Sequence, residues 1–471
     1  MKLMGLLFLL LWSIGCTGPA SKTTAEVAAS RVEISTYLDQ ATDLTGQRRY
    51  AEAVSELEKA SLVNRHDIRP QIQIGQIYLA QQRWELAEQA FRQGLSQDPE
   101  NRDATIGVAE TLMGRGYPIE ATFFWRQAIE QDDSRPDGWA GLGRAYLARG
   151  DYAAAQHAFQ QALQRGDHPR AQWYLAGLTL PSDWSAGRDL LTPLAAQDNR
   201  SKHLLAALAP LLDPTADIPD QQSEVAKITG IALIQLEEWP LAHHALTEAV
   251  AGRPEDAQAW AFLGYTQSNL GLPALAALAE ARQLAPDLAL IPYFEGIYLR
   301  QQGKPALAVN RFQQALDMDP NNLGVALEMA QTLAEQGDYL SAEAWYQALV
   351  ELEPEAAIYQ EYLTAFYVER SFRVVESGLA AAEQLVIMQP DSARTHNLLG
   401  WARFQVGDFV GAETALRQAI TLNPADVAAR YHLGRVLKAQ HRAVEAQAEF
   451  SRVIDWDTSG LYRERVLDSR R

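Results

Sequence analysis

Apolar residues recur at three- and four-residue spacing through most of the chain, and the clearest example is the stretch 136–169. This spacing predicts two short amphipathic helices, each with one apolar face. The apolar positions of this stretch are Trp139, Leu142 and Tyr146 in the first helix and Ala155, Phe159 and Ala162 in the second. Gly150 and Asp151 separate the helices, because Gly is typical directly after a helix and Asp directly before one. Neither helix could bury its apolar face alone, so the pair is expected to pack on neighbours.

Similar pairs return about every 34 residues, which is the signature of a stacked array. The pattern Trp139-x2-Leu142-Gly143-x2-Tyr146, followed by Ala155-x3-Phe159, resembles the tetratricopeptide repeat (TPR). The resemblance implies an all-α fold, a right-handed α-solenoid of about 11–12 helix-turn-helix units. In such an array each unit contacts its neighbours, so one domain can span most of a 471-residue chain.

The pattern also predicts the organisation of the chain. The expected segments are a signal peptide (1–15), a polar tether (16–33), an N-terminal array (34–200), an additional helix and loop that interrupt the array (201–222), a C-terminal array (223–460) and a capping helix or tail (461–471). Two units are irregular: one has a short second helix before Pro286, and the unit at 357–392 is longer than its neighbours.

The N-terminus, MKLMGLLFLLLWSIGC, has a basic start, an apolar run and a small residue before the only cysteine, Cys16. This build is typical of a signal peptide, and the run is shorter than the roughly 20 residues of a transmembrane helix. The segment resembles a bacterial lipoprotein signal, which implies lipidation of Cys16. It departs from that pattern at Ser13, where an aliphatic residue is usual. An ordinary signal peptide and an uncleaved anchor are the alternatives. Thr17 resembles the residue that sorts lipoproteins to an outer membrane.

The net charge of −18 argues against a nucleic-acid-binding protein, which is expected to carry a basic surface. It also argues against electrostatic docking on anionic lipid, so membrane contact is expected through the N-terminal lipid only. A single cysteine excludes an intramolecular disulfide and a four-cysteine zinc site.

Motifs that carry chemistry are missing from the sequence. There is no HExxH, Walker loop or GxSxG, and Gly141-x-Gly143 lacks the third glycine and the preceding strand of a nucleotide fingerprint. His243 and His244 are helix neighbours and point about 100° apart, so they do not face one metal ion together. The sequence therefore predicts no catalytic residue, no metal site, no cofactor and no enzymatic activity.

In the TPR family the first helices line a concave groove, where ligands usually lie. Two groups of groove positions combine the residue types that favour binding, since aromatic and arginine side chains are typical of interface hot spots. The first group consists of Phe262, Tyr265, Tyr293 and Phe294. The second group consists of Arg394, Asn397, Trp401, Phe404, Tyr431, Arg435 and Lys438. Packing between helices is the alternative interpretation of both groups.

The leading hypothesis is a membrane-tethered scaffold that binds a partner protein or an extended peptide in the groove. Similar lipid-anchored TPR proteins serve in cell-envelope assembly, secretion or pilus machinery. The expected location is the cell envelope: the periplasmic face of the outer membrane if there is one, otherwise the outer face of the cytoplasmic membrane. An enzyme subunit or adaptor of a peptidoglycan or peptidase enzyme is one alternative, and a glycan or small-ligand receptor is another.

Overall fold

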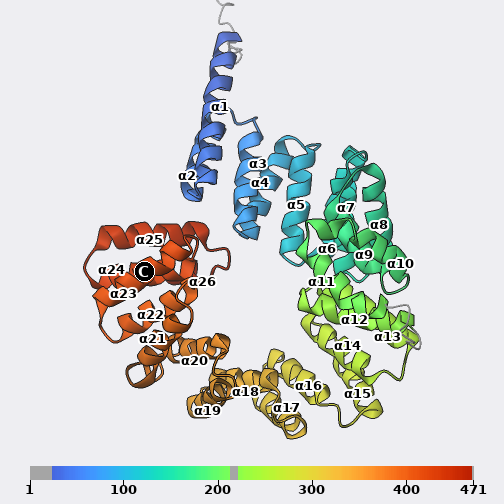
Figure 1. Ribbon diagram of the computed structural model, residues 1–471. Helices are drawn as coiled ribbons and strands as arrows, with labels where there is room; N and C mark the ends of the chain where they lie inside the picture. Colours follow the sequence, from blue (N-terminus) through green and yellow to red (C-terminus); the bar gives the residue numbers. More distant parts are fainter. Residues whose placement is uncertain (1–23, 213–220, 469–471) are drawn as a thin grey trace, which may run out of the picture.

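The computed structural model describes residues 24–212 and 221–468, and these form helices joined by short turns (Figure 1). The signal peptide expected at 1–15, Cys16 and the last three residues lie outside the described residues. The α-helices are α1 (Thr24–Gly46), α2 (Tyr50–Val63), α3 (Arg69–Ala80), α4 (Trp84–Gln97), α5 (Arg102–Gly114), α6 (Pro118–Gln131), α7 (Pro136–Ala148), α8 (Tyr152–Arg165), α9 (Pro169–Thr179), α10 (Trp184–Leu191), α11 (Asn199–Leu208), α12 (Gln221–Gln235), α13 (Trp239–Gly252), α14 (Ala257–Asn269), α15 (Leu275–Leu284), α16 (Leu290–Gln301), α17 (Pro305–Met318), α18 (Leu323–Gln336), α19 (Tyr339–Leu352), α20 (Ala357–Glu369), α21 (Leu379–Met388), α22 (Ala393–Gln405), α23 (Phe409–Leu422), α24 (Val427–Ala439), α25 (Ala443–Trp456) and α26 (Leu461–Asp468).

The helices pair in chain order, so the expected all-α solenoid is the observed architecture. The turn inside the unit 136–169 shows how a pair is made. Gly150 has φ +79°, a left-handed conformation that favours glycine and ends α7. Asp151 precedes α8 as expected, but its side chain makes no capping hydrogen bond. Its carboxylate instead pairs with Arg149 at 3.1 Å.

Close contact between helices depends on small residues at the expected positions. A Cβ atom built on Gly143 would lie 2.6 Å from the ring of Phe159, and one built on Gly296 would overlap the ring of Phe312 in the same way. The ring of Phe159 is fully buried. Each aromatic ring thus fills the space that a glycine leaves open.

The chain departs from a regular array at three places. First, α1 begins at Thr24, so residues 24–33, which were expected in a tether, are helical. Second, between α10 and α12 stands the single helix α11, followed by a 3₁₀ turn, η2 (Ala209–Leu212); another 3₁₀ turn, η1 (Leu194–Ala196), precedes it. Third, the unit 357–392 contains a π-helical segment, η3 (Val374–Gly378).

The core continues across the interruption expected at 201–222. One apolar cluster extends from Ala140 through Leu204 to Ala245, and α13 contacts both α7 and α9. His244 Nε2 lies 3.2 Å from the carbonyl oxygen of Leu178, and His243 Nδ1 lies 2.6 Å from the hydroxyl of Tyr152. The two neighbouring histidines therefore hold this joint between the units before and after α11.

The two ends of the array meet (Figure 1). The indole Nε1 of Trp456 donates to the carbonyl oxygen of Arg48 at 2.7 Å, and the amide of Gln81 donates to the carbonyl oxygen of Asp455 at 2.6 Å. We call this contact, formed by Arg48, Gln81, Asp455 and Trp456, the seam. The described part of the array is therefore closed into a ring.

First helices form the inner layer of the ring. Most successive first helices, such as α14 and α16 or α22 and α24, contact one another as well as the second helix of their own unit. Helices on the inside of a curve approach each other more closely than those on the outside. The groove positions named above thus belong to the inner layer.

Candidate binding surface on the C-terminal first helices

The second group of predicted residues lies on α22 and α24, at the end of the array. Trp401 stacks on Phe404, with ring centroids 4.7 Å apart, and on His432 of the next unit, at 4.3 Å. The capping helix α26 adds Tyr462, whose ring lies 5.3 Å from that of Tyr431. These side chains form one continuous aromatic cluster, in which Tyr431 is buried at 6% exposed and the other rings are partly exposed. We call this cluster the C-terminal aromatic surface.

Arg435 lies over this surface. Its guanidinium carbon is 5.7 Å from the ring centroid of Trp401 and 5.9 Å from that of Phe404, within the range of cation–π attraction. Its Nη1 donates to the hydroxyl of Tyr431 at 3.0 Å. Among the described residues Arg435 has no carboxylate partner, so its charge is balanced only by aromatic rings and solvent.

Lys438 stands one helical turn further along α24 and is exposed, without an ion pair to any described residue. Arg465 of α26 lies over the ring of Tyr462 at 5.3 Å. The charges of Arg435 and Arg465 both act on His432, and Lys438 follows Arg435 on α24, so the three cations belong to one end of the array. In a chain of net charge −18, such a group is a local exception.

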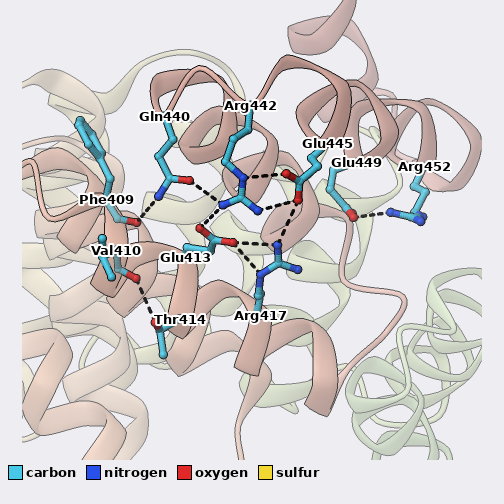
Figure 2. A network of polar contacts seen from close by, with 10 residues as sticks. All are labelled: Phe409, Val410, Glu413, Thr414, Arg417, Gln440, Arg442, Glu445, Glu449 and Arg452. Carbon is cyan, nitrogen blue, oxygen red and sulfur yellow. Dashed lines mark hydrogen bonds and ion pairs between the residues drawn. The ribbon is translucent and has the colours of Figure 1, made fainter.

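Charges on the outer helices of the same units are arranged differently (Figure 2). Arg442, the residue directly before α25, pairs with Glu413 of α23 at 2.6 Å and with Glu445 at 2.6 Å. Arg417 also binds Glu413, at 2.8 Å, and Arg452 pairs with Glu449. The outer cations drawn in Figure 2 are thus neutralised by carboxylates, whereas Arg435 on the inner layer is not.

Two predicted residues of this group are occupied by contacts inside the protein. Asn397 is 8% exposed, and its Oδ1 accepts from Nδ1 of His432 at 2.7 Å. Arg394 is held by an ion pair with Glu361 of the preceding unit. Asn397 therefore positions a ring of the aromatic surface, and Arg394 is available to a ligand only if Glu361 releases it.

Sequence reasoning missed His432 and Tyr462. Burial, together with the charges of Arg465 and Arg435, lowers the pKa of His432 to about 3, so the ring is neutral and can stack on Trp401. His432 directly follows Tyr431, and a histidine on an apolar helix face carries no signal of its own. Tyr462 belongs to the capping helix, outside the repeat pattern.

The first predicted group, Phe262, Tyr265, Tyr293 and Phe294, is also brought together, but around a buried centre. Phe294 is 4% exposed and stacks on Tyr265 at 4.5 Å between ring centroids. Tyr293 and Phe262 flank it, each at 5.3 Å. Burial raises the pKa of Tyr265 and of Tyr293. This geometry favours the packing interpretation for the first group.

Other features relevant to chemistry lie apart from these groups. A cavity of about 390 Å³ between α6, α7 and α8 is lined by Trp139, Tyr146 and Arg126, and coincides with neither group. No cluster of three or more His, Cys, Asp or Glu side chains in the described ranges could hold a metal ion. Among the described helices, none combines the length and apolar character needed to cross a bilayer.

Comparison with known proteins agrees with this architecture. Three family models, each described as tetratricopeptide repeat, match the chain: one at residues 44–105, 299–365 and 403–463, another at 136–167 and a third at 229–289. Together these segments cover more than half of the chain. The chain is a TPR protein. The matched segments contain the complete helix pairs α3–α4, α7–α8, α14–α15, α18–α19 and α24–α25.

Solved structures of similar fold include yeast Tom70, with 13% identity, a TM-score of 0.40, and coverage of 93% of this chain and 96% of that chain. The APC/C hetero-tetramer Cut9–Hcn1 has 13% identity and a TM-score of 0.39, covering 88% of this chain and 98% of that chain. MamA from Desulfovibrio magneticus RS-1 has 21% identity and a TM-score of 0.32, covering 36% of this chain and 96% of that chain.

Proposed function

We propose that this TPR protein is a membrane-tethered scaffold that holds an acidic segment of a partner protein on the C-terminal aromatic surface. The observation that carries the proposal is the unpaired charge of Arg435 above the rings of Trp401 and Phe404. A carboxylate of the partner would supply the missing counter-charge, and hydrogen bonds between charged groups are the strong ones. Lys438 provides a second cation one turn away.

The scaffold loses little conformational freedom in this binding mode. The guanidinium of Arg435 is already held by Tyr431, and the ring of His432 is fixed by Asn397 at 2.7 Å. Side chains that are ordered before binding cost less entropy when the partner arrives. An acidic segment with aromatic residues could place its rings on Trp401 and Phe404 while its carboxylates meet the cations.

Binding can be measured with a short fluorescein-labelled peptide rich in glutamate and tyrosine. Arg435→Ala combined with Lys438→Ala should lower its affinity roughly tenfold or more, since each charged hydrogen bond contributes about 1.5–3 kcal/mol. The affinity should also fall with added salt. Arg452→Ala is the matched control, because it removes a cation from the outer layer. Equal affinity of the double variant and the parent would contradict the proposal.

The tether and the location in the cell envelope are supported by the resemblance of residues 1–16 to a lipoprotein signal. In a bacterial host, Cys16→Ser should prevent incorporation of a palmitate analogue and should move the protein from the membrane fraction to the soluble fraction. Retention of the label by the serine variant would rule out lipidation at this residue. A role in envelope assembly, secretion or pilus machinery follows from the same resemblance.

A further inference from the structure

The seam differs from every joint between neighbouring units in how it is held together. Apolar clusters join successive units, but Arg48, Gln81, Asp455 and Trp456 belong to none of them. The contacts across the seam are polar. They are the hydrogen bonds made by Trp456 and Gln81, a hydrogen bond from the backbone N–H of Ala51 to the Asp455 carboxylate, and the guanidinium of Arg48, which lies 5.8 Å from the Trp456 ring centroid. A contact without a shared apolar core can separate while the units on either side stay folded.

Closure also has an uncompensated cost. Gln81 is 2% exposed, and although its amide nitrogen donates across the seam, its Oε1 is buried without a hydrogen-bond partner. A buried polar atom without a partner loses its hydration and gains nothing in return. Opening the seam would return this oxygen to water, so this desolvation cost of the closed ring disappears in the open ring.

The seam is connected to the C-terminal aromatic surface through α24. Arg430 lies over the Trp456 ring at 4.5 Å and pairs with Glu449 at 2.8 Å. The next residue, Tyr431, is the hydrogen-bond partner of Arg435. The helix α24 thus contacts the seam residue Trp456 through Arg430, and it carries the proposed binding residues on another face.

A second connection passes through α26. Tyr462 packs on Tyr431, and the following residue, Arg463, lies near Arg83 beside the seam. Burial lowers the pKa of the Arg83 guanidinium, and the charge of Arg463 makes a smaller contribution in the same direction. Asp457 fixes the start of α26 by accepting from the backbone N–H groups of Tyr462 and Arg463, both at 2.8 Å. A movement of α24 or α26 at the binding surface would therefore reach the seam.

We propose that the seam is a gate: the ring opens between the first two units and the end of α25 to admit a partner to the inner layer, and the bound partner holds it closed. The coupling of gate to partner rests on the function proposed above, whereas the opening itself does not. By linkage, a partner that favours the closed ring must bind more weakly when closure is weakened.

Opening can be measured by electron paramagnetic resonance between two spin labels across the seam. The labels would be placed on cysteines that replace Gln47 and Thr458, two exposed residues without contacts across the seam, in a chain with Cys16→Ser. Gln81→Ala with Trp456→Ala removes two of the hydrogen bonds across the seam and should raise the population with long distances roughly tenfold or more.

Trp184→Ala is the control, because this tryptophan also lies beneath an arginine, Arg188 at 4.9 Å, but on α10, away from the seam. It should leave the distances unchanged. The acidic peptide should shift the parent toward short distances and bind the double seam variant several-fold more weakly.

Unchanged distances in the folded seam variant would overturn the gate. So would longer distances in that variant with an undiminished affinity for the peptide. A peptide that binds equally well to the Arg435→Ala variant would overturn the proposed function instead, while the distances measured without peptide would still decide whether the ring opens at the seam.

Discussion

At the scale of single residues, small side chains set the distance between helices, and Gly143 allows a direct test. A Cβ atom here would lie 2.6 Å from the buried ring of Phe159, so Gly143→Ala should overpack the joint between α7 and α8. We expect a loss of about 1–3 kcal/mol in the free energy of unfolding, although alanine is otherwise the better helix former.

Gly46→Ala is the matched control for this substitution. Nothing lies within 4 Å of a Cβ atom at Gly46, the last residue of α1, so its stability should equal or exceed that of the parent. Urea denaturation of both variants would measure the difference. If Gly143→Ala proved as stable as Gly46→Ala, packing would not be the reason for glycine at this position.

The same residues show how far sequence reasoning reaches. Gly143 and Phe159 could be assigned to packing because their spacing repeats along the chain. The contact of His432 with Trp401 and Asn397 could not be predicted, since it depends on the angle between α22 and α24. The unpaired state of Arg435 was equally out of reach, because pairing depends on which carboxylates the folded units bring near.

At the scale of elements, two arginines join neighbouring helices in different environments. Arg430 of α24 is 7% exposed, pairs with Glu449 of α25 and donates to the carbonyl oxygen of Pro424 at 3.0 Å. Arg430→Ala leaves the carbonyl oxygen of Pro424 without its donor and leaves Glu449 with Arg452 as its remaining ion-pair partner. This variant should therefore destabilise the C-terminal units by about 1.5–3 kcal/mol.

Arg442, in the outer network of Figure 2, should respond differently. Its pair with Glu445 is exposed and its pair with Glu413 is partly buried. Ion pairs near the surface contribute little and are screened by salt. Arg442→Ala should cause a smaller loss, which shrinks further at high salt. Urea denaturation at low and high salt would compare the two variants, and an equal, salt-independent loss in both would contradict this assignment.

The irregular unit 357–392 shows what the repeat pattern predicts about an element and what it does not. Its excess length was visible in the sequence, but not where the extra residues would go. The structure places them at the start of the second helix, where Ser371 and Arg373 have φ values of 51° and 46° and the π-helical segment η3 follows. Arg373 also pairs at 2.6 Å with Glu343 of α19, in the preceding unit. A contact between units of this kind cannot be predicted from the local sequence pattern.

At the scale of the whole molecule, the repeat pattern predicted a solenoid but not a ring. Each unit fixes only its own angle to the next, and small deviations accumulate over the array. The seam joins residues more than 370 positions apart in the sequence, so it leaves no periodic signal. Closure of the ring is thus the feature of the fold that required the structure.

Acid should tighten the closed ring, and Asp455 provides the reason. The pKa of its carboxyl is raised to about 6, mainly by burial and to a smaller extent by the neighbouring Glu52 of α2. The backbone N–H of Ala51 and the guanidinium of Arg83 oppose this rise. Arg83 in turn interacts electrostatically with Arg463 of α26. In an open ring the carboxyl would regain an ordinary pKa near 3.9. The closed ring therefore takes up a proton between about pH 4 and pH 6, and closure is strongest below this range.

As the pH rises through about 6, the closing equilibrium should weaken by up to roughly a hundredfold, since each pKa unit corresponds to a factor of ten. The spin-label distances across the seam, recorded from about pH 4 to pH 7, should show the long population growing as Asp455 ionises. Asp455→Asn keeps the size of the side chain and removes its charge, so this variant should stay closed over the whole range. A variant that opened with the same pH dependence as the parent would show that another group controls the seam.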